Sequence, residues 1–342
     1  MTTRAAIAVT LLALSACAST PPSHGAPCTN DHIESTLVRT LRFARQNPRG
    51  VSDGFDIDRH VSDASDPIGC RHADFTSPSG VPGIDNQIAT LVPIIESQAG
   101  GVTLDAILQT AINDGQLLLA IELLGVDDEH NDDCVTIRTR PLQGTPSLGT
   151  DHLVEVGQTF DAQPNGEQTL VPNARIVNGI VDVGPVPLTV PVAILDARFT
   201  LHIQSGYMHL EIHDDGVWVG KLGGGIAIRE MTMIAMGLNI PPSLMSTAML
   251  LLESSADLAP DPMTNRCTQV SSTLLFESVT AFVYDDNVDA AVIPSDAGAD
   301  ARGGVDAGIS MADANLRDAS VDAAMSVDLG ATDATDAASA AD

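Results

Sequence analysis

Alternating apolar and polar residues from Gln116 onward restrict the fold of this chain more than any other feature. Period-two alternation places every second side chain on one face of a strand, so such segments form sheets with one buried face. The candidate strands are 116–126, 133–140, 152–156, 168–177, 179–183, 188–204 in pieces, 207–213, 216–222 and 268–284. We therefore expect a β-rich α+β fold, an antiparallel sandwich or partly closed barrel with a few peripheral helices.

Turn-forming residues separate several of these segments. Residues 204–207 (Gln-Ser-Gly-Tyr) and 214–216 (Asp-Asp-Gly) have the composition of hairpin turns. Three prolines between residues 185 and 191 predict an edge position or a bend, because proline cannot donate to a strand ladder. The three glycines at 223–225 are expected to leave the sheet as a bend before a helix.

Helical spacing predicts five helices. Ile33, Leu37, Leu41 and Ala44 share one helical face, which predicts a helix over 31–45. The other four are predicted at about 86–97, 104–112, 227–237 and 242–255, and a long loop-like region covers 50–85.

The N-terminus has the pattern of an export signal. Arg4 precedes an apolar run from Ala5 to Leu14, about half the ~20 residues that span a bilayer. The next residues complete the sequence Leu-Ser-Ala-Cys at 14–17, which resembles the lipobox of bacterial lipoproteins. The resemblance implies that residues 1–16 are removed and that Cys17 is acylated, which would anchor the protein to a membrane.

Two further residues bear on the location of the protein. Position 18 is Ala rather than Asp, which in lipoproteins of this kind implies the outer membrane. Ala16 and Ala18 also fit the site of an ordinary secretory signal peptide, and cleavage there would release the protein.

Composition divides the chain into four parts. Residues 17–28 are expected to form a tether, and 29–288 a single globular domain, helical or loop-like over 29–115 and strand-rich over 116–288. Residues 289–342 contain eleven Asp, two Arg, no Glu, no Lys and no aromatic residue. Such a tail cannot bury enough apolar surface to offset its chain entropy, so we expect it to be disordered.

The charge balance excludes one class of partner. The net charge is −29, which repels phosphate backbones, so we expect no nucleic-acid binding. The membrane, reached through the N-terminal lipid, is the expected partner, and the sequence identifies no protein or ligand.

Cysteine number predicts disulfides. If Cys17 carries lipid, Cys28, Cys70, Cys134 and Cys267 remain, and an even number in an exported chain predicts two bonds. We favour Cys28–Cys70 and Cys134–Cys267 among the three possible pairings, since the first would tie the N-terminal region to itself. Buried free thiols are the alternative.

The first candidate metal site is an acidic loop between two predicted strands. Its candidate ligands are Asp127, Asp128, Asp132 and Asp133. Clustered carboxylates repel each other unless water or a cation screens them, and Ca²⁺ takes several oxygen ligands. A polar hairpin tip is the alternative.

The second candidate is the loop at 53–58, where Asp56 and Asp58 form an Asp-x-Asp pair with further Asp residues downstream. Such a pair in an irregular loop can bind a hard cation, although the spacing is not that of an EF-hand. A structural loop tied down by Cys70 explains the same pattern.

The third candidate is a histidine face. With a two-residue turn at Ser205-Gly206, His202 would lie opposite His209, and Glu211 would share their face. Two histidines and a carboxylate can bind Zn²⁺, whereas the alternative is the solvated face of an amphipathic hairpin.

No catalytic motif is present, neither a G-x-S-x-G, an H-E-x-x-H nor a P-loop. We therefore expect a non-catalytic binding or structural module of the cell envelope, stabilised by Ca²⁺. One alternative is an apolar-ligand carrier, in which the sheet and the Met-rich helices enclose a lipid. The other is a metal-dependent hydrolase that uses the histidine face.

Overall fold

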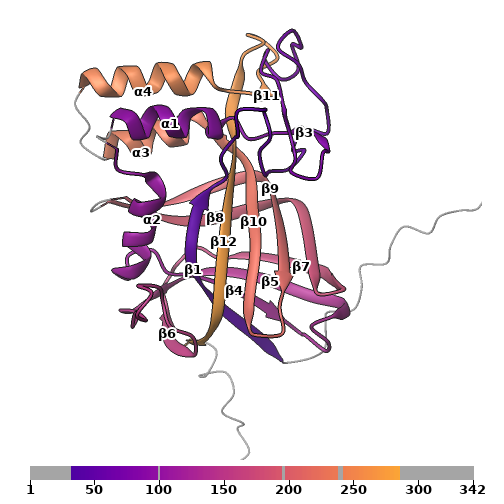
Figure 1. Cartoon of the computed structure of the whole chain (residues 1–342), viewed down its shortest axis with the longest axis vertical. Coiled ribbons are helices and arrows are strands. Elements are labelled where there is room, and N and C mark those ends of the chain that lie inside the picture. The colour runs from indigo at the N-terminus through magenta and orange to yellow at the C-terminus, as the bar shows by residue number, and fades with distance from the viewer. Residues whose placement is uncertain (1–31, 99–100, 195–196, 238–241, 286–342) are drawn as a thin grey trace, which may run out of the picture. The chain divides into compact units, whose positions relative to one another are not determined.

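The computed structural model describes residues 32–98, 101–194, 197–237 and 242–285. Eight antiparallel strands of this part close into a barrel, with a few helices packed against it (Figure 1). The barrel strands are β1 (Ile33–Phe43), β4 (Leu119–Leu124), β5 (Asn131–Gln143), β7 (Thr169–Val177), β8 (Ile180–Ile194), β9 (Ala197–Ile212), β10 (Val217–Ala227) and β12 (Cys267–Tyr284). The predicted β-rich α+β fold is confirmed, and the sheet closes because β12 pairs with β1.

Each barrel strand pairs with the next barrel strand along the chain, as in an up-and-down barrel. The remaining elements are insertions. Between β1 and β4 lie β2 (Phe75–Thr76), β3 (Pro82–Ile84), α1 (Ile88–Gln98) and α2 (Leu104–Asn113). Between β5 and β7 lies β6 (Gln158–Ala162), and between β10 and β12 lie α3 (Ile228–Gly237), α4 (Pro242–Ser254) and β11 (Leu258–Pro260).

The main core fills the barrel. Ile121, Ile137, Leu210 and Trp218 are all buried and belong to one continuous apolar cluster. The interior of an eight-stranded barrel is just wide enough for side chains to fill it, which agrees with this packing.

Helices supply the remaining apolar contacts. The buried residues Leu108 and Ile112 of α2 join the barrel core. A second, smaller core is formed by Leu91 of α1, Leu252 of α4 and Val270 of β12, so these two helices pack against the first residues of β12. Figure 1 shows α4 outermost, above α1 and α3.

Four of the five predicted helices are confirmed by α1–α4, with ends within two residues of those expected. Most of the predicted strands are confirmed as well. Residues 152–156 are an exception, because only Val154 makes an isolated bridge, to Leu148, and the next strand starts at Gln158. The prolines coincide with a bend, since pairing of β8 with β9 shifts register on either side of Val186.

The predicted helix over 31–45 is wrong, because this segment forms β1. Ile33, Leu37 and Leu41 are four residues apart, a spacing that fits both the helical repeat and the two-residue repeat of a strand. The intervening Thr and Val residues favour a strand, and pairing with both β4 and β12 completes it.

Two predicted breaks in the sheet are also wrong. β9 continues through Ser205-Gly206, and β10 continues through the glycines at 223–225. Both positions need glycine for close packing rather than for a turn. A Cβ at Gly206 would lie 2.5 Å from the Leu188 side chain, and a Cβ at Gly224 would lie 2.3 Å from the Ile203 side chain. The predicted turn at 214–216 is confirmed between β9 and β10.

Candidate metal centre

Asp56, Asp58 and Asp85 each place a carboxylate oxygen within 4.8 Å of the others. Asp56 and Asp58 belong to the long irregular segment after β1, and Asp85 directly follows β3. A backbone bridge brings the two segments together, since the Asp85 N–H donates to the Phe55 carbonyl at 2.9 Å. The structure thus unites the two predicted ligands of the second candidate site and adds Asp85 to them.

Asp85 is the buried member of this group, with 3% of its surface exposed. Its Oδ2 accepts hydrogen bonds from the backbone N–H groups of Ile57 at 2.6 Å and Asp58 at 3.3 Å. Burial, with a smaller contribution from the charge of Asp58, nevertheless raises the pKa of Asp85 to about 8. Without a counter-charge, this site therefore disfavours an ionised carboxylate.

The neighbouring carboxylates are affected in the same direction. Burial raises the pKa of Asp74 to about 6, and the charges of Asp58 and Asp56 add to the shift. Burial likewise raises the pKa of Asp58. Negative charge is thus crowded around one point, which is the electrostatic condition that a bound cation relieves.

No Arg or Lys within the described ranges forms an ion pair with these three aspartates. The five arginines that form ion pairs in this part of the chain do so with other carboxylates, namely Glu277, Glu96, Asp105, Glu122, Asp285 and Asp133. Lys221 of β10 also contacts this loop, but its Nζ donates to the Gly54 carbonyl at 3.1 Å and lies 5.1 Å from the Phe55 ring centroid. Three clustered carboxylates fit a hard cation such as Ca²⁺, which prefers oxygen ligands.

The two residues after Asp85 attach the acidic loop to the barrel. Asn86 is fully buried, and its amide donates to the Ser52 hydroxyl at 2.8 Å and accepts from the Thr273 N–H at 3.1 Å. The backbone N–H of Gln87 donates to the Ser271 hydroxyl at 2.7 Å. The position of Asp85 is therefore fixed relative to β12.

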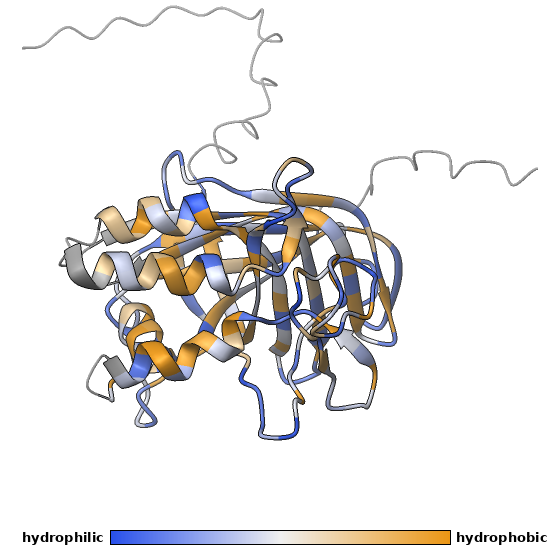
Figure 2. Cartoon of the chain, turned by 90° about the horizontal axis from the view of Figure 1, so that it is seen from above, coloured by the Kyte–Doolittle hydropathy of each residue, from blue (hydrophilic) through white to orange (hydrophobic). Residues whose placement is uncertain are grey.

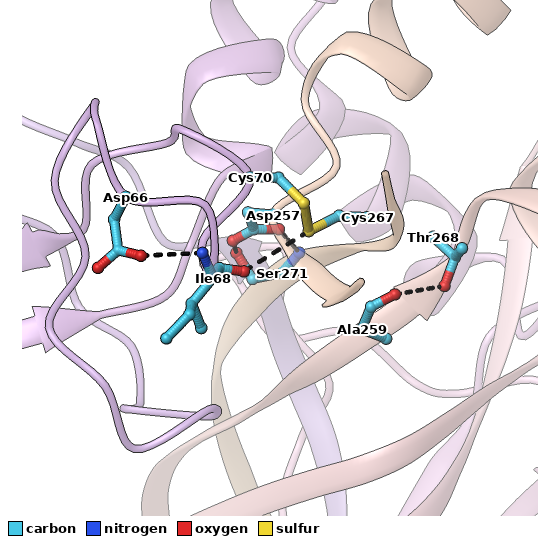
Figure 3. Close-up of a disulfide and its surroundings, with 8 residues drawn as sticks. All are labelled: Asp66, Ile68, Cys70, Asp257, Ala259, Cys267, Thr268 and Ser271. Carbon is cyan, nitrogen blue, oxygen red and sulfur yellow. Dashed lines mark hydrogen bonds between the residues drawn. A yellow bond between two sulfur atoms is a disulfide. The ribbon is translucent and has the colours of Figure 1, made fainter. Parts of the chain in front are cut away.

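Asp257, which lies between α4 and β11, is a buried carboxylate that the sequence did not reveal. It accepts hydrogen bonds from the Ser271 N–H at 2.8 Å and the Ser271 hydroxyl at 2.5 Å (Figure 3). Burial raises its pKa to about 7. A single Asp between Ala256 and Leu258 has no motif around it, so no sequence signal could have identified this residue.

A disulfide holds the same region together. Cys70, in the long loop, is bonded to Cys267 at the start of β12, with 5.9 Å between their Cα atoms (Figure 3). Both predicted pairings are therefore wrong, because each gave one of these residues a different partner. Cys134 is disulfide-bonded as well. Cys28, and Cys17 with the predicted signal, tether and acidic tail, lie outside the described residues.

The carboxylates of the first candidate site do not gather. Asp132 accepts from the N–H groups of Asp127 at 2.6 Å and Cys134 at 2.8 Å, whereas Asp128 accepts from the His130 N–H at 2.8 Å. Asp133 pairs with Arg175. Backbone N–H groups and an arginine thus take the roles expected of a cation, and the segment has the geometry of a polar hairpin tip.

The histidine face is not assembled as predicted. His202 and His209 are on the same strand, opposite Thr189 and Asp182 of β8 respectively, and seven residues separate them by about 23 Å. His202 lies between Glu167, at 2.8 Å, and Glu230, at 2.9 Å. His209 contacts Asp182 at 2.6 Å and Glu211 at 3.2 Å. The predicted cross-strand His202–His209 pair is wrong because the turn that required it does not form.

A cavity of about 580 Å³ lies outside the barrel core, between α2 and the strands β1, β10 and β12. Its polar lining comes from Arg42, Asp105, Gln109 and Glu277, together with Thr40. Asp105 and Glu277 already form ion pairs with Arg45 and Arg39. The rest of the lining is apolar and consists of Leu41, Ala106, Val219, Leu275 and Phe276, with Gly220. The cavity is therefore mixed in character.

Comparison with protein-family models, curated proteins and solved structures found no match for the chain. None of the helices in the described ranges has the length and hydrophobicity needed to cross a bilayer.

Proposed function

We propose that the protein is a non-catalytic binding or structural module of the cell envelope, held at a membrane through Cys17 and stabilised by Ca²⁺ at Asp56, Asp58 and Asp85. One observation carries the Ca²⁺ assignment: three carboxylates lie within 4.8 Å of one another with no Arg or Lys ion pair among the described residues. The export signal and the lipobox-like residues 14–17 support the membrane assignment.

A structural ion suits the loop in which these aspartates lie. The segment from Ala44 to Gln87 contains only two short strands, and loops of this length without regular structure need other means of support. A cation that bridges Asp56 and Asp58 to Asp85 would join the first part of this segment to its end, next to the anchor of Asn86 on β12.

The other two functions have less support. An apolar-ligand carrier needs an open interior, whereas inward side chains such as Trp218 and Leu210 fill the barrel. A zinc hydrolase needs ligands that converge, whereas His202 and His209 are about 23 Å apart along one strand.

The test is thermal unfolding of the full chain in EDTA and then with excess Ca²⁺, Mg²⁺ or Zn²⁺. For a dissociation constant near 1 mM, 10 mM Ca²⁺ adds about 1.4 kcal/mol, or roughly 3–6 °C for a domain of this size. Asp56→Asn and Asp85→Asn should abolish the rise. Asp128→Asn, which removes an acidic group outside the cluster, should keep it.

Two outcomes would overturn the Ca²⁺ assignment: no rise with Ca²⁺, or an equal rise in Asp85→Asn. The membrane assignment is tested separately by detergent phase partition of the protein expressed with its signal. The wild type should enter the detergent phase and Cys17→Ser should remain in the aqueous phase.

A further inference from the structure

The cavity beside α2 lies on the outer face of the barrel and shares no residue with the acidic cluster. Figure 2 shows the helices gathered on one side of the barrel, as in Figure 1, where α2 lies next to β1. The register of the strands aligns Thr40 of β1 with Glu277 of β12 and Val219 of β10. Because Val219 follows the core residue Trp218, these side chains face outward and form one wall of the cavity. Its volume of about 580 Å³ falls within the usual range for ligand pockets.

Arg42 carries the one charge of the lining that no described residue neutralises. The other charged residues of the lining are Asp105, which pairs with Arg45, and Glu277, which pairs with Arg39. Arg42 forms no ion pair and no side-chain hydrogen bond with the part of the chain that the structure describes. A guanidinium group presents a planar fork of N–H donors that matches a carboxylate, so Arg42 is suited to bind one at the cavity.

Lys221 adds to the positive potential at this place. Arg42 and Lys221 both align with Leu275, on opposite sides of β12, so their Cα atoms are about 10 Å apart. Lys221 is the only lysine of the chain, and its one hydrogen bond among the described residues goes to the neutral Gly54 carbonyl. Two cations without an acidic partner thus flank Leu275, in a chain with a net charge of −29. Such a local field attracts anions.

The rest of the lining selects among anions. Val219 is 39% exposed and Leu275 is half-buried, so both leave apolar surface for a ligand to cover. A small hydrated ion would leave that surface in water, whereas an organic ion with an apolar body would bury it. The carboxylates of Asp105 and Glu277 disfavour a second negative charge nearby, and a monoanion therefore fits better than a phosphate.

Hydrogen bonds hold the α2 wall of the cavity on β1. The Gln109 amide donates to the Arg39 carbonyl at 2.9 Å, and the Phe43 N–H donates to the Asp105 carboxylate at 3.1 Å. These bonds use backbone groups of β1 that an added strand would need, which argues against an extended peptide as the ligand. They also fix the wall before any ligand binds, which lowers the entropy lost on binding.

We infer that this cavity binds a small organic monoanion, a carboxylate on an apolar body. The carboxylate pairs with Arg42, and the apolar body covers Val219 and Leu275. The site lies outside the barrel, so it does not need the open interior that an apolar-ligand carrier requires. It adds a ligand to the proposed binding module but involves neither Ca²⁺ nor Cys17, and its failure would leave both of those assignments untouched.

The test is calorimetric titration of the full chain carrying Cys17→Ser, so that no attached acyl chain competes, with octanoate, acetate and octanol as probes. Octanoate should bind, and acetate and octanol should each bind at least about tenfold more weakly, because acetate lacks the apolar body and octanol lacks the charge. Arg42→Gln should weaken octanoate binding by at least about tenfold. Arg49→Gln is the matched control, since Arg49 is also exposed and without an ion pair in the described residues but lies outside the cavity, and it should bind as the parent does.

A second pair of variants fills the cavity instead of removing the charge. Ala106 lines the cavity from an exposed position of α2, so Ala106→Phe should lower octanoate affinity by at least about tenfold. Thr110→Phe, one turn further along the helix and outside the lining, is its control. Unchanged melting temperatures establish that the variants fold. The inference is overturned if octanoate does not bind, if acetate or octanol binds as tightly, or if Arg42→Gln or Ala106→Phe binds octanoate as its control does.

Discussion

Cys70 and Cys267 join two parts of the chain that are 197 positions apart in sequence. Cys70 lies in the long loop after β1, and Cys267 is the first residue of β12. The loop that carries the acidic cluster is thus attached to β12 through this bond and through hydrogen bonds of Asn86 and Gln87. These attachments limit how far the loop can move from the barrel.

Loss of the disulfide should therefore destabilise the whole domain. Cys70→Ser and Cys267→Ser should each lower the free energy of unfolding by about 2–5 kcal/mol, because an open chain gains conformational entropy when it unfolds. Urea unfolding under oxidising conditions measures this change. The double variant should match the single ones, and a double variant that loses twice as much would contradict a shared bond.

Hydrophobic spacing predicted some elements of this fold and misassigned others for physical reasons. The stripe from Leu104 to Ile112 identifies α2 because residues spaced by three and four positions fit only a helix. Spacing by four alone, as in Ile33, Leu37 and Leu41, fits both structures, and the register shift after Val38 then buries Leu37 and Leu41 on opposite faces of β1. No local pattern contains that shift.

Glycine produced the second kind of error. Gly216 lies in a turn and has a φ of +76°, as the Asp-Asp-Gly sequence indicates. Gly206 lies within β9 because the Leu188 side chain needs its space. The sequence around each glycine does not reveal which role it has, because the packing that requires Gly206 comes from Leu188 on another strand.

The candidate site was predictable only in part. Asp56 and Asp58 were identified by their spacing, but the isolated bridge between Phe55 and Asp85 decides which distant carboxylate joins them. The acidic run at 127–133 had the stronger sequence signal, yet its carboxylates turn toward separate partners. A high density of acidic residues in the sequence therefore did not predict which carboxylates lie close together.

A buried ion-pair network on β4 and β5 should matter more for stability than any surface pair. Glu122 is 1% exposed and accepts hydrogen bonds from Arg138 at 2.6 Å and Arg140 at 3.0 Å. Glu122→Gln removes the charge that Arg138 and Arg140 share, and of these two only Arg140 has a second ion-pair partner among the described residues, Asp285. Unfolding in urea should therefore show a loss of about 3–5 kcal/mol. The control is Asp133→Asn, whose exposed pair with Arg175 should contribute less than about 1 kcal/mol. Similar losses in both variants would contradict the assignment of Glu122 to a buried network.

Stability should fall with rising pH when divalent cations are removed. Burial raises the pKa of Asp257 to about 7, so between about pH 4 and pH 7 the folded state binds more protons than the unfolded state. The free energy of unfolding then decreases as pH rises through this window, and Asp74 and Asp85 act in the same direction. Asp257→Asn should reduce the loss between pH 5 and pH 8 by roughly 1–3 kcal/mol, measured by urea unfolding in EDTA. If the stability of this variant falls with pH as steeply as that of the wild type, Asp257 ionises as readily in the folded state as in the unfolded state.

Trp218 reports whether the barrel interior is filled. It is the only tryptophan of the chain, it is 3% exposed, and it belongs to the barrel core with Leu210 and Phe276. Its fluorescence should therefore be blue-shifted and poorly quenched by acrylamide until the protein unfolds, because packed side chains exclude water and quencher. Leu210→Ala should lower the free energy of unfolding by about 2–5 kcal/mol, because the smaller side chain leaves a cavity in the packed core. Strong quenching in the folded state, or a Leu210→Ala variant as stable as the wild type, would instead indicate an open interior and return support to the apolar-ligand carrier.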